Sequence, residues 1–171
     1  MEKQEIIKKI KKGKIFIYPT DTIYGIGCDA TNQQSVNKIK QIKKRKNKPM
    51  SVIAPNISWI KDHLIIDIDL DKYLPGPFTI ILKKKNKNFL KHVSDTDMLG
   101  IRIPKCNITK TIQMSGVPFI TTSVNLAGEK PITKISEIPD QIKDQIDVII
   151  DQGPLTGKPS TIIIGEKQIK R

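Results

Sequence analysis

The sequence has few of the residues from which disulfide frameworks and zinc centres are built. Its 171 residues include two cysteines and two histidines. Cys28 and Cys106 lie far apart and neither belongs to a CxxC pair, and His63 and His92 lack the HxxxH spacing of a helical zinc site. We therefore expect no disulfide scaffold and no metal site built from side chains, which fits a reducing cytoplasm.

Long apolar runs are also absent. No stretch approaches the roughly 18 uninterrupted apolar residues that a membrane-spanning helix needs. The N-terminal sequence MEKQEIIKKIKKGK lacks the apolar middle of a secretory signal. We therefore expect a soluble, cytoplasmic protein with no membrane partner. With 37% hydrophobic residues, residues 1–171 are expected to form one domain with its own core.

Acidic residues are scarce relative to basic ones. There are 30 Lys and Arg against 17 Asp and Glu, a formal net charge of +13. The basic residues concentrate in segments 8–14, 38–48 and 83–87. A coding bias toward Lys and Ile would produce a similar excess, so the lysines do not by themselves establish a partner. The clusters nevertheless favour a ligand that carries phosphates, either a nucleotide or RNA.

The spacing of apolar residues predicts alternating helices and strands. Helices are predicted over 2–12, 32–46, 58–64, 109–114 and 136–145. Strands are predicted over 14–18, 50–54, 78–82, 99–103, 118–122, 148–151 and 161–164. No linker, repeat or low-complexity tract interrupts the pattern. The fold class is therefore predicted to be α/β.

Two familiar catalytic motifs are excluded by their spacing. Residues 153–160 read GPLTGKPS, which is one residue shorter than the phosphate loop GxxxxGK[ST] and has Pro159 where the helix-opening hydroxyl residue should stand. No GxSxG nucleophile elbow is present, and no Ser/His/Asp set follows from the spacing. The sequence thus predicts neither a Walker-type ATPase nor a serine hydrolase.

Polar residues stand inside otherwise apolar strands and turns. Thr20, Asp21 and Thr22 lie between a predicted strand and the glycines Gly25 and Gly27. Small hydroxyls and backbone N–H groups at such a place allow close approach of a ligand. The alternative is an ordinary turn closed by side-chain hydrogen bonds.

Three further polar features suggest an anion site. The segment 43–49, KKRKNKP, offers several donors to a polyphosphate, or is simply a solvated helix end. Residues 121–125, TTSVN, follow a strand at the end where α/β sheets place ligand contacts. Arg102 stands in an apolar strand and needs an anion, either a protein carboxylate or the carboxylate of a ligand.

Taken in order, the motifs PTDTIYGIG, KxR with a following KP, PGPFT, GIRIP, TSVNLAG and PSTII resemble the YrdC-like threonylcarbamoyl-AMP synthase family. The match extends from about residue 14 to residue 164. It implies a twisted mixed sheet flanked by helices, with an open, positively charged cavity. It also implies a nucleotidyltransferase that converts L-threonine, bicarbonate and ATP to threonylcarbamoyl-AMP and pyrophosphate. Partner proteins would then use the adenylate to form threonylcarbamoyladenosine in tRNA.

The resemblance also implies roles for individual residues. Thr22, Arg102 and Thr161 would bind threonine, and Lys43 and Arg45 would be the catalytic basic residues. The residues implied for ATP binding are Arg45, Lys48, Met98, Thr121, Ser123 and Asn125. ATP would be a substrate accompanied by Mg²⁺, with no permanent cofactor.

Two other functions are compatible with parts of the sequence. A non-catalytic protein that binds double-stranded RNA or tRNA would use the positive charge, although the chain has 5% aromatic residues and no RNP-like or GXXG signature. RNA could also be a further partner of the enzyme. A carbamoyl-transfer module like that of hydrogenase maturation proteins is the nearer alternative, but those modules belong to larger chains.

Overall fold

The computed structural model describes residues 1–44, 48–126 and 128–171. The helices are α1 (Lys3–Lys11), α2 (Gln33–Ile42), α3 (Ile57–His63), α4 (Asn107–Met114) and α5 (Asp140–Lys143), with short 3-10 turns η1 (Leu70–Lys72) and η2 (Ile135–Glu137). The strands are β1 (Phe16–Tyr18), β2 (Gly25–Gly27), β3 (Ser51–Ile53), β4 (Leu64–Ile65), β5 (Phe78–Lys84), β6 (Met98–Arg102), β7 (Phe119–Ser123), β8 (Val148–Ile149), β9 (Thr161–Ile164) and β10 (Lys167–Ile169).

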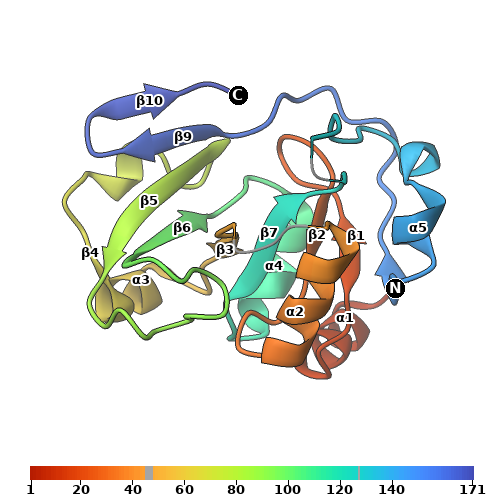
Figure 1. Cartoon of the computed structure of the whole chain (residues 1–171), viewed down its shortest axis with the longest axis horizontal. Helices are drawn as coiled ribbons and strands as arrows, with labels where there is room; N and C mark the ends of the chain where they lie inside the picture. The colour runs from red at the N-terminus through yellow and green to blue at the C-terminus, as the bar shows by residue number, and fades with distance from the viewer. Residues whose placement is uncertain (45–47, 127) are drawn as a thin grey trace.

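The strands form one mixed sheet in the order β10-β9-β5-β6-β3-β7-β2-β1-β8, with β4 added beside β5. The pairs β9–β5, β6–β3 and β1–β8 are parallel, and the remaining pairs are antiparallel. Helices lie on both sides of the sheet (Figure 1). The predicted α/β fold, with a mixed sheet flanked by helices, is confirmed.

Alternate residues of the central strands enter two separate cores. In β1, Ile17 packs with the α2 side chains Val36 and Ile39, whereas Phe16 and Tyr18 pack with the buried residues of α1 and α4. Because side chains in a strand point to opposite faces in turn, these clusters mark the two faces of the sheet. In Figure 1, α2 accordingly lies in front of the sheet and α4 behind it.

The face that carries α1 and α4 becomes polar along the central strands. Ser51 precedes Val52 and Ile53 in β3, and it is paired with Thr121 of β7 on one side and Gly100 of β6 on the other. Ser51 shares its face with Ile53, and Thr121 shares its face with Phe119, both of which belong to the α1–α4 core. The same sheet face therefore supplies a hydrophobic core at one end and small polar side chains at the other.

Three strands were not predicted, and one predicted helix is interrupted. β2 has the sequence GIG, whose glycines are unfavourable in a strand. Here a Cβ on Gly27 would lie 2.0 Å from the carbonyl oxygen of Ile120, so the close strand approach requires glycine. The short strands β4 and β10 were also not predicted. The helix predicted over 136–145 is divided into η2 and α5 because Pro139, between them, has no N–H to donate.

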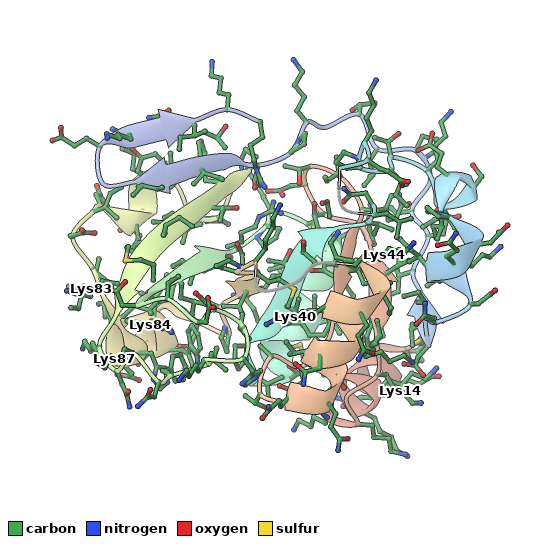
Figure 2. The ribbon with its side chains drawn as sticks, in the orientation of Figure 1. Lys14, Lys40, Lys44, Lys83, Lys84 and Lys87 are labelled. Atoms are coloured by element: carbon green, nitrogen blue, oxygen red, sulfur yellow. The ribbon has the colours of Figure 1, made fainter. Side chains whose placement is uncertain are left out.

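The basic segment 83–87 lies apart from the other two basic segments of the sequence. Figure 2 shows Lys14 near α1, Lys40 and Lys44 along α2, and Lys83, Lys84 and Lys87 at the opposite side, where β4 and β5 meet. Lys83, Lys84 and Lys87 therefore lie apart from Lys14, whereas Lys14 and Lys38 are close enough that both act on the Asp147 carboxylate. In the described ranges, no helix combines the length and apolar character required to cross a membrane.

Candidate active site

A pocket of about 270 Å³ opens where the polar ends of several strands meet. Its lining residues with charged side chains are Arg102 and Arg171, and no Asp or Glu belongs to the described lining. The pocket can therefore receive an anion without facing a negative wall. The lining comprises Thr20, Thr22, Ile23, Tyr24, Gly25, Pro49, Met50, Ser51, Thr79, Arg102, Thr121, Thr122, Ser123, Pro131, Pro159, Ser160 and Arg171.

The threonines between β1 and β2 form a closed turn and also line the pocket. Thr20 Oγ1 donates to the carbonyl oxygen of Ile23 at 2.7 Å and accepts from the Thr22 N–H at 3.1 Å. The Thr20 hydroxyl has one proton, which it donates to Ile23. In the 2.8 Å contact between the hydroxyls of Thr20 and Thr22, the Thr22 hydroxyl is therefore the donor. Thr22 Oγ1 consequently presents lone pairs to the pocket, and one of them accepts from Arg102 Nη2 at 3.3 Å.

Arg102 is held by a buried ion pair. Its Nη2 donates to Asp21 Oδ1 at 2.9 Å, and the side chains are only 8% and 10% exposed. Asp21 Oδ2 accepts from the Lys105 N–H at 2.8 Å, which orients the carboxylate. Burial lowers the pKa of the Arg102 guanidinium, and the Asp21 charge acts against that effect. Within the described part of the chain, the buried Nε of Arg102 has no hydrogen-bond partner. Asp21 therefore supplies the protein carboxylate, while the guanidinium retains an unused donor.

A second polar group follows β7. Ser123 Oγ donates to Asn125 Oδ1 at 2.5 Å, and Asn125 Oδ1 also accepts from Lys43 Nζ at 3.1 Å. Lys43, the C-cap residue of α2, is 3% exposed. It donates to the backbone carbonyls of Ser123 and of Asn125 as well. The end of α2 is thereby fixed to the end of β7, directly behind the pocket wall.

The segment 151–160 covers one side of the pocket without forming a helix or strand. The Tyr24 hydroxyl donates to this segment, where the Gly153 carbonyl lies at 2.7 Å and Asp151 Oδ1 at 3.0 Å, and it accepts from the Gln152 N–H at 3.0 Å. Ser160 Oγ contacts Thr79 Oγ1 at 2.7 Å and accepts from Arg171 Nη2 at 2.6 Å. The segment is thus attached to β2 at one end and to β5 at the other.

Replacing Tyr24 by phenylalanine should lower the free energy of unfolding by about 1–3 kcal/mol, because the buried groups of segment 151–153 lose their partner. Urea denaturation would measure the change. Tyr73→Phe is the matched control, since the Tyr73 hydroxyl makes no hydrogen bond to the described residues; its effect should stay within about 0.5 kcal/mol. Equal losses in both variants would contradict the assigned role of Tyr24.

The structure brings four of the predicted site residues into the pocket lining: Thr22, Arg102, Thr121 and Ser123. Lys43 and Asn125 lie behind Ser123 and outside that lining. Lys48 is exposed and precedes the lining residue Pro49. Thr161 and Met98 are not among the described lining residues, although Ser160, the neighbour of Thr161, is. Arg45 falls outside the described residues.

Several lining residues were not selected from the sequence. Ser51 and Thr79 are isolated hydroxyl residues in apolar strands, so only the strand register shows that they share a face with Thr121 and Arg102. Gly157 lies in the rejected GPLTGKPS segment, yet its backbone touches that of Thr22. In the described ranges, no group of three His, Cys, Asp or Glu residues is placed to hold a metal ion.

Comparison with known proteins identifies the family. Residues 8–171 match the Sua5/YciO/YrdC family model, described as "telomere recombination". The chain is 32% identical over 164 residues to the threonylcarbamoyl-AMP synthase of Pseudoalteromonas translucida, covering 90% of this chain and 87% of the relative. The corresponding enzyme of Vibrio campbellii is 28% identical, with 93% and 91% coverage. A Methanocaldococcus jannaschii protein provisionally given the same name is 39% identical, with 95% and 81% coverage.

Solved structures of family members show the same fold. P. abyssi Sua5 in complex with L-threonine superposes with a TM-score of 0.82 at 26% identity, over 96% of this chain. This chain spans 52% of that Sua5 chain, so the match concerns about half of the larger protein. E. coli YciO has the same fold, with a TM-score of 0.84 over 98% of this chain and 86% of YciO. The chain therefore belongs to the Sua5/YciO/YrdC family, and the names of its relatives confirm the predicted enzyme class, a threonylcarbamoyl-AMP synthase.

Proposed function

We propose that this pocket joins L-threonine, bicarbonate and ATP into threonylcarbamoyl-AMP, which downstream proteins use to modify tRNA. The observation that carries the proposal is that residues from separate motifs meet in one pocket. Thr22, Arg102 and Ser123 come from three separate sequence motifs, and their side chains line a single pocket of about 270 Å³. The threonine complex of P. abyssi Sua5 supports an amino-acid site in this fold.

The polar groups of the pocket suit the proposed substrates. Arg102 lines the pocket, and its guanidinium offers charge-assisted hydrogen bonds to the carboxylate of threonine. The lone pairs of Thr22 Oγ1 can accept from the ammonium or hydroxyl group of the same molecule. Both groups are already fixed by protein contacts, so little side-chain ordering remains when the substrate binds.

The reaction consists of two bond-forming steps. The nitrogen of threonine attacks bicarbonate, and loss of water gives a carbamate. A carbamate oxygen then attacks the α-phosphorus of ATP, the bond to the bridging oxygen breaks, and pyrophosphate leaves with that electron pair. The threonine carboxylate, bicarbonate, the carbamate and the ATP phosphates all carry negative charge, so Arg102 and Arg171 would reduce their repulsion and align them. Because the described lining offers no carboxylate to a metal, Mg²⁺ would arrive bound to the triphosphate.

The proposed function predicts a graded choice among amino acids. Serine lacks only a methyl contact, which is worth about 10–200-fold, whereas valine leaves a buried hydroxyl partner unpaired and should be rejected about 10⁴-fold. Pyrophosphate release by the purified protein, measured with ATP, bicarbonate and each amino acid, tests this order. Comparable turnover of threonine and valine would exclude a pocket that recognises the hydroxyl group. RNA binding without threonine-dependent pyrophosphate release would instead favour the non-catalytic alternative.

A further inference from the structure

We propose that Lys43 is a positioning residue, which acts through the Ser123–Asn125 turn and does not itself touch substrate. The inference deepens the proposed function and rests on it for the identity of the ligands. It replaces the catalytic role implied for Lys43 by the family resemblance. The argument begins with the place of the ammonium group, which is buried outside the pocket lining even though its segment is rich in exposed cations.

The Lys43 ammonium is hydrogen-bonded to protein oxygens of the described residues. An ammonium group has three N–H bonds, and three protein oxygens surround Nζ: the carbonyls of Ser123 and Asn125 and the side-chain Oδ1 of Asn125. A buried ammonium without such partners would be very unfavourable. Its location at the carboxyl end of α2, where the helix dipole favours a positive charge, stabilises it further.

The side-chain amide of Asn125 is also hydrogen-bonded at both its oxygen and its nitrogen. Its Oδ1 accepts from Lys43 and Ser123, and its Nδ2 donates to the carbonyls of Leu126 at 2.9 Å and Glu129 at 2.8 Å. These contacts determine the orientation of the amide, because the opposite orientation would place N–H groups against the ammonium and an oxygen against two carbonyls. The side-chain amide of Asn125 therefore has no donor or acceptor left for ATP, and this side chain too acts by holding the turn.

Ser123 connects this buried network to the pocket. Its carbonyl is bound by Lys43, its hydroxyl donates to Asn125, and its side chain lies on the pocket wall. The next amide in the chain, that of Val124, donates to the carbonyl of Tyr24 at 3.2 Å and so links the turn to the residue that precedes β2. Loss of the Lys43 ammonium should therefore release the backbone at 123–126 and shift the wall against which a ligand is aligned.

The first test needs no ligand. Lys43→Met keeps the length and apolar stem of the side chain but removes the three N–H donors. Amide hydrogen exchange should become at least about tenfold faster at residues 123–126 than in the wild-type protein. Lys44→Met is the matched control, since Lys44 is an exposed cation at the same helix end, and it should leave those amides unchanged. Unchanged exchange at 123–126 in Lys43→Met would overturn the proposal.

The second test separates positioning from direct contact with ATP. If Lys43 only positions the turn, Lys43→Met should weaken ATP binding by about tenfold at low and at high salt alike, because screening acts on exposed ion contacts. Asn125→Ala should cause a similar loss, and the double variant should be no weaker than the poorer single variant. Direct contact between Lys43 and ATP would be shown by either of two results. The loss of ATP affinity in Lys43→Met would become smaller as salt rises, or the losses of the two single variants would add in the double variant. Asn125→Ala also serves if Lys43→Met does not fold.

The two tests distinguish this inference from the function on which it rests. If the wild-type protein binds no ATP, the proposed function fails, while hydrogen exchange of the ligand-free variants still decides the role of Lys43. If ATP binds normally and exchange at 123–126 does not respond to Lys43→Met, the positioning role fails and the proposed function stands.

Discussion

Replacing Arg102 by alanine should lower the free energy of unfolding by about 3–5 kcal/mol, since it leaves the buried Asp21 carboxylate without its partner. Asp21 is 10% exposed in the ion pair and cannot recover full hydration where it stands. The same change removes a guanidinium from the pocket lining. Threonine-dependent pyrophosphate release should therefore become undetectable at temperatures where the variant is still folded.

Arg102→Lys separates the two effects. Lysine keeps a positive charge beside Asp21, so most of the stability should return, but it lacks the planar set of donors that can serve Asp21 and a ligand carboxylate together. We expect a folded protein, shown by its urea denaturation midpoint, that does not bind threonine in calorimetry. Normal threonine affinity in this variant would argue that Arg102 is structural and that the carboxylate binds elsewhere.

Gly157→Ala should raise the KM for threonine by about 100-fold, because a displacement of about 1 Å at a reacting site has effects of that size. A Cβ at this position would lie 2.2 Å from the carbonyl oxygen of Thr22 and 2.6 Å from its Cα. Both contacts are with backbone, so the segment 151–160 and the Thr20–Thr22 turn must move apart. Steady-state pyrophosphate release over a range of threonine concentrations measures the change.

Gly153→Ala provides the control in the same segment. Gly153 has a positive φ of 80°, but a Cβ there meets nothing within 4 Å. Alanine at this position should cost about 1–2 kcal/mol of stability through backbone strain and leave the KM for threonine nearly unchanged. If the two variants alter KM equally, the close approach of Gly157 to Thr22 is not what shapes the pocket.

Residue type was sufficient to predict several residues that line the pocket. Arg102 was selected because an arginine inside an apolar strand demands an anion, and the structure supplies Asp21 at 2.9 Å. The hydroxyl residues at the end of β7 were selected by their position after a buried strand. In both cases the reasoning used a local conflict between polarity and surroundings, which can be read from a short stretch of sequence.

Other parts of the site depend on contacts between distant segments and leave no local trace. Lys43 reads as one of several surface lysines, and only the path of α2 beside β7 brings it to oxygens 80 residues and more along the chain. Gly157 reads as part of a loop, and its reason for being glycine lies in the backbone of Thr22. The pattern of apolar residues likewise did not predict β2. Glycine has a low strand propensity, and the reason for a glycine at position 27 is the close approach of the neighbouring strand.

The pocket is lined by residues from Thr20 to Arg171, so its lining includes segments that are synthesised long after one another. The Thr20–Thr22 turn packs against segment 151–160, where Gly157 approaches Thr22. This contact cannot form until the ribosome has translated that segment. Nascent chains released early would contain the central strands but lack the wall that holds Ser160. Premature termination should therefore yield products with an incomplete pocket, which we expect not to consume ATP.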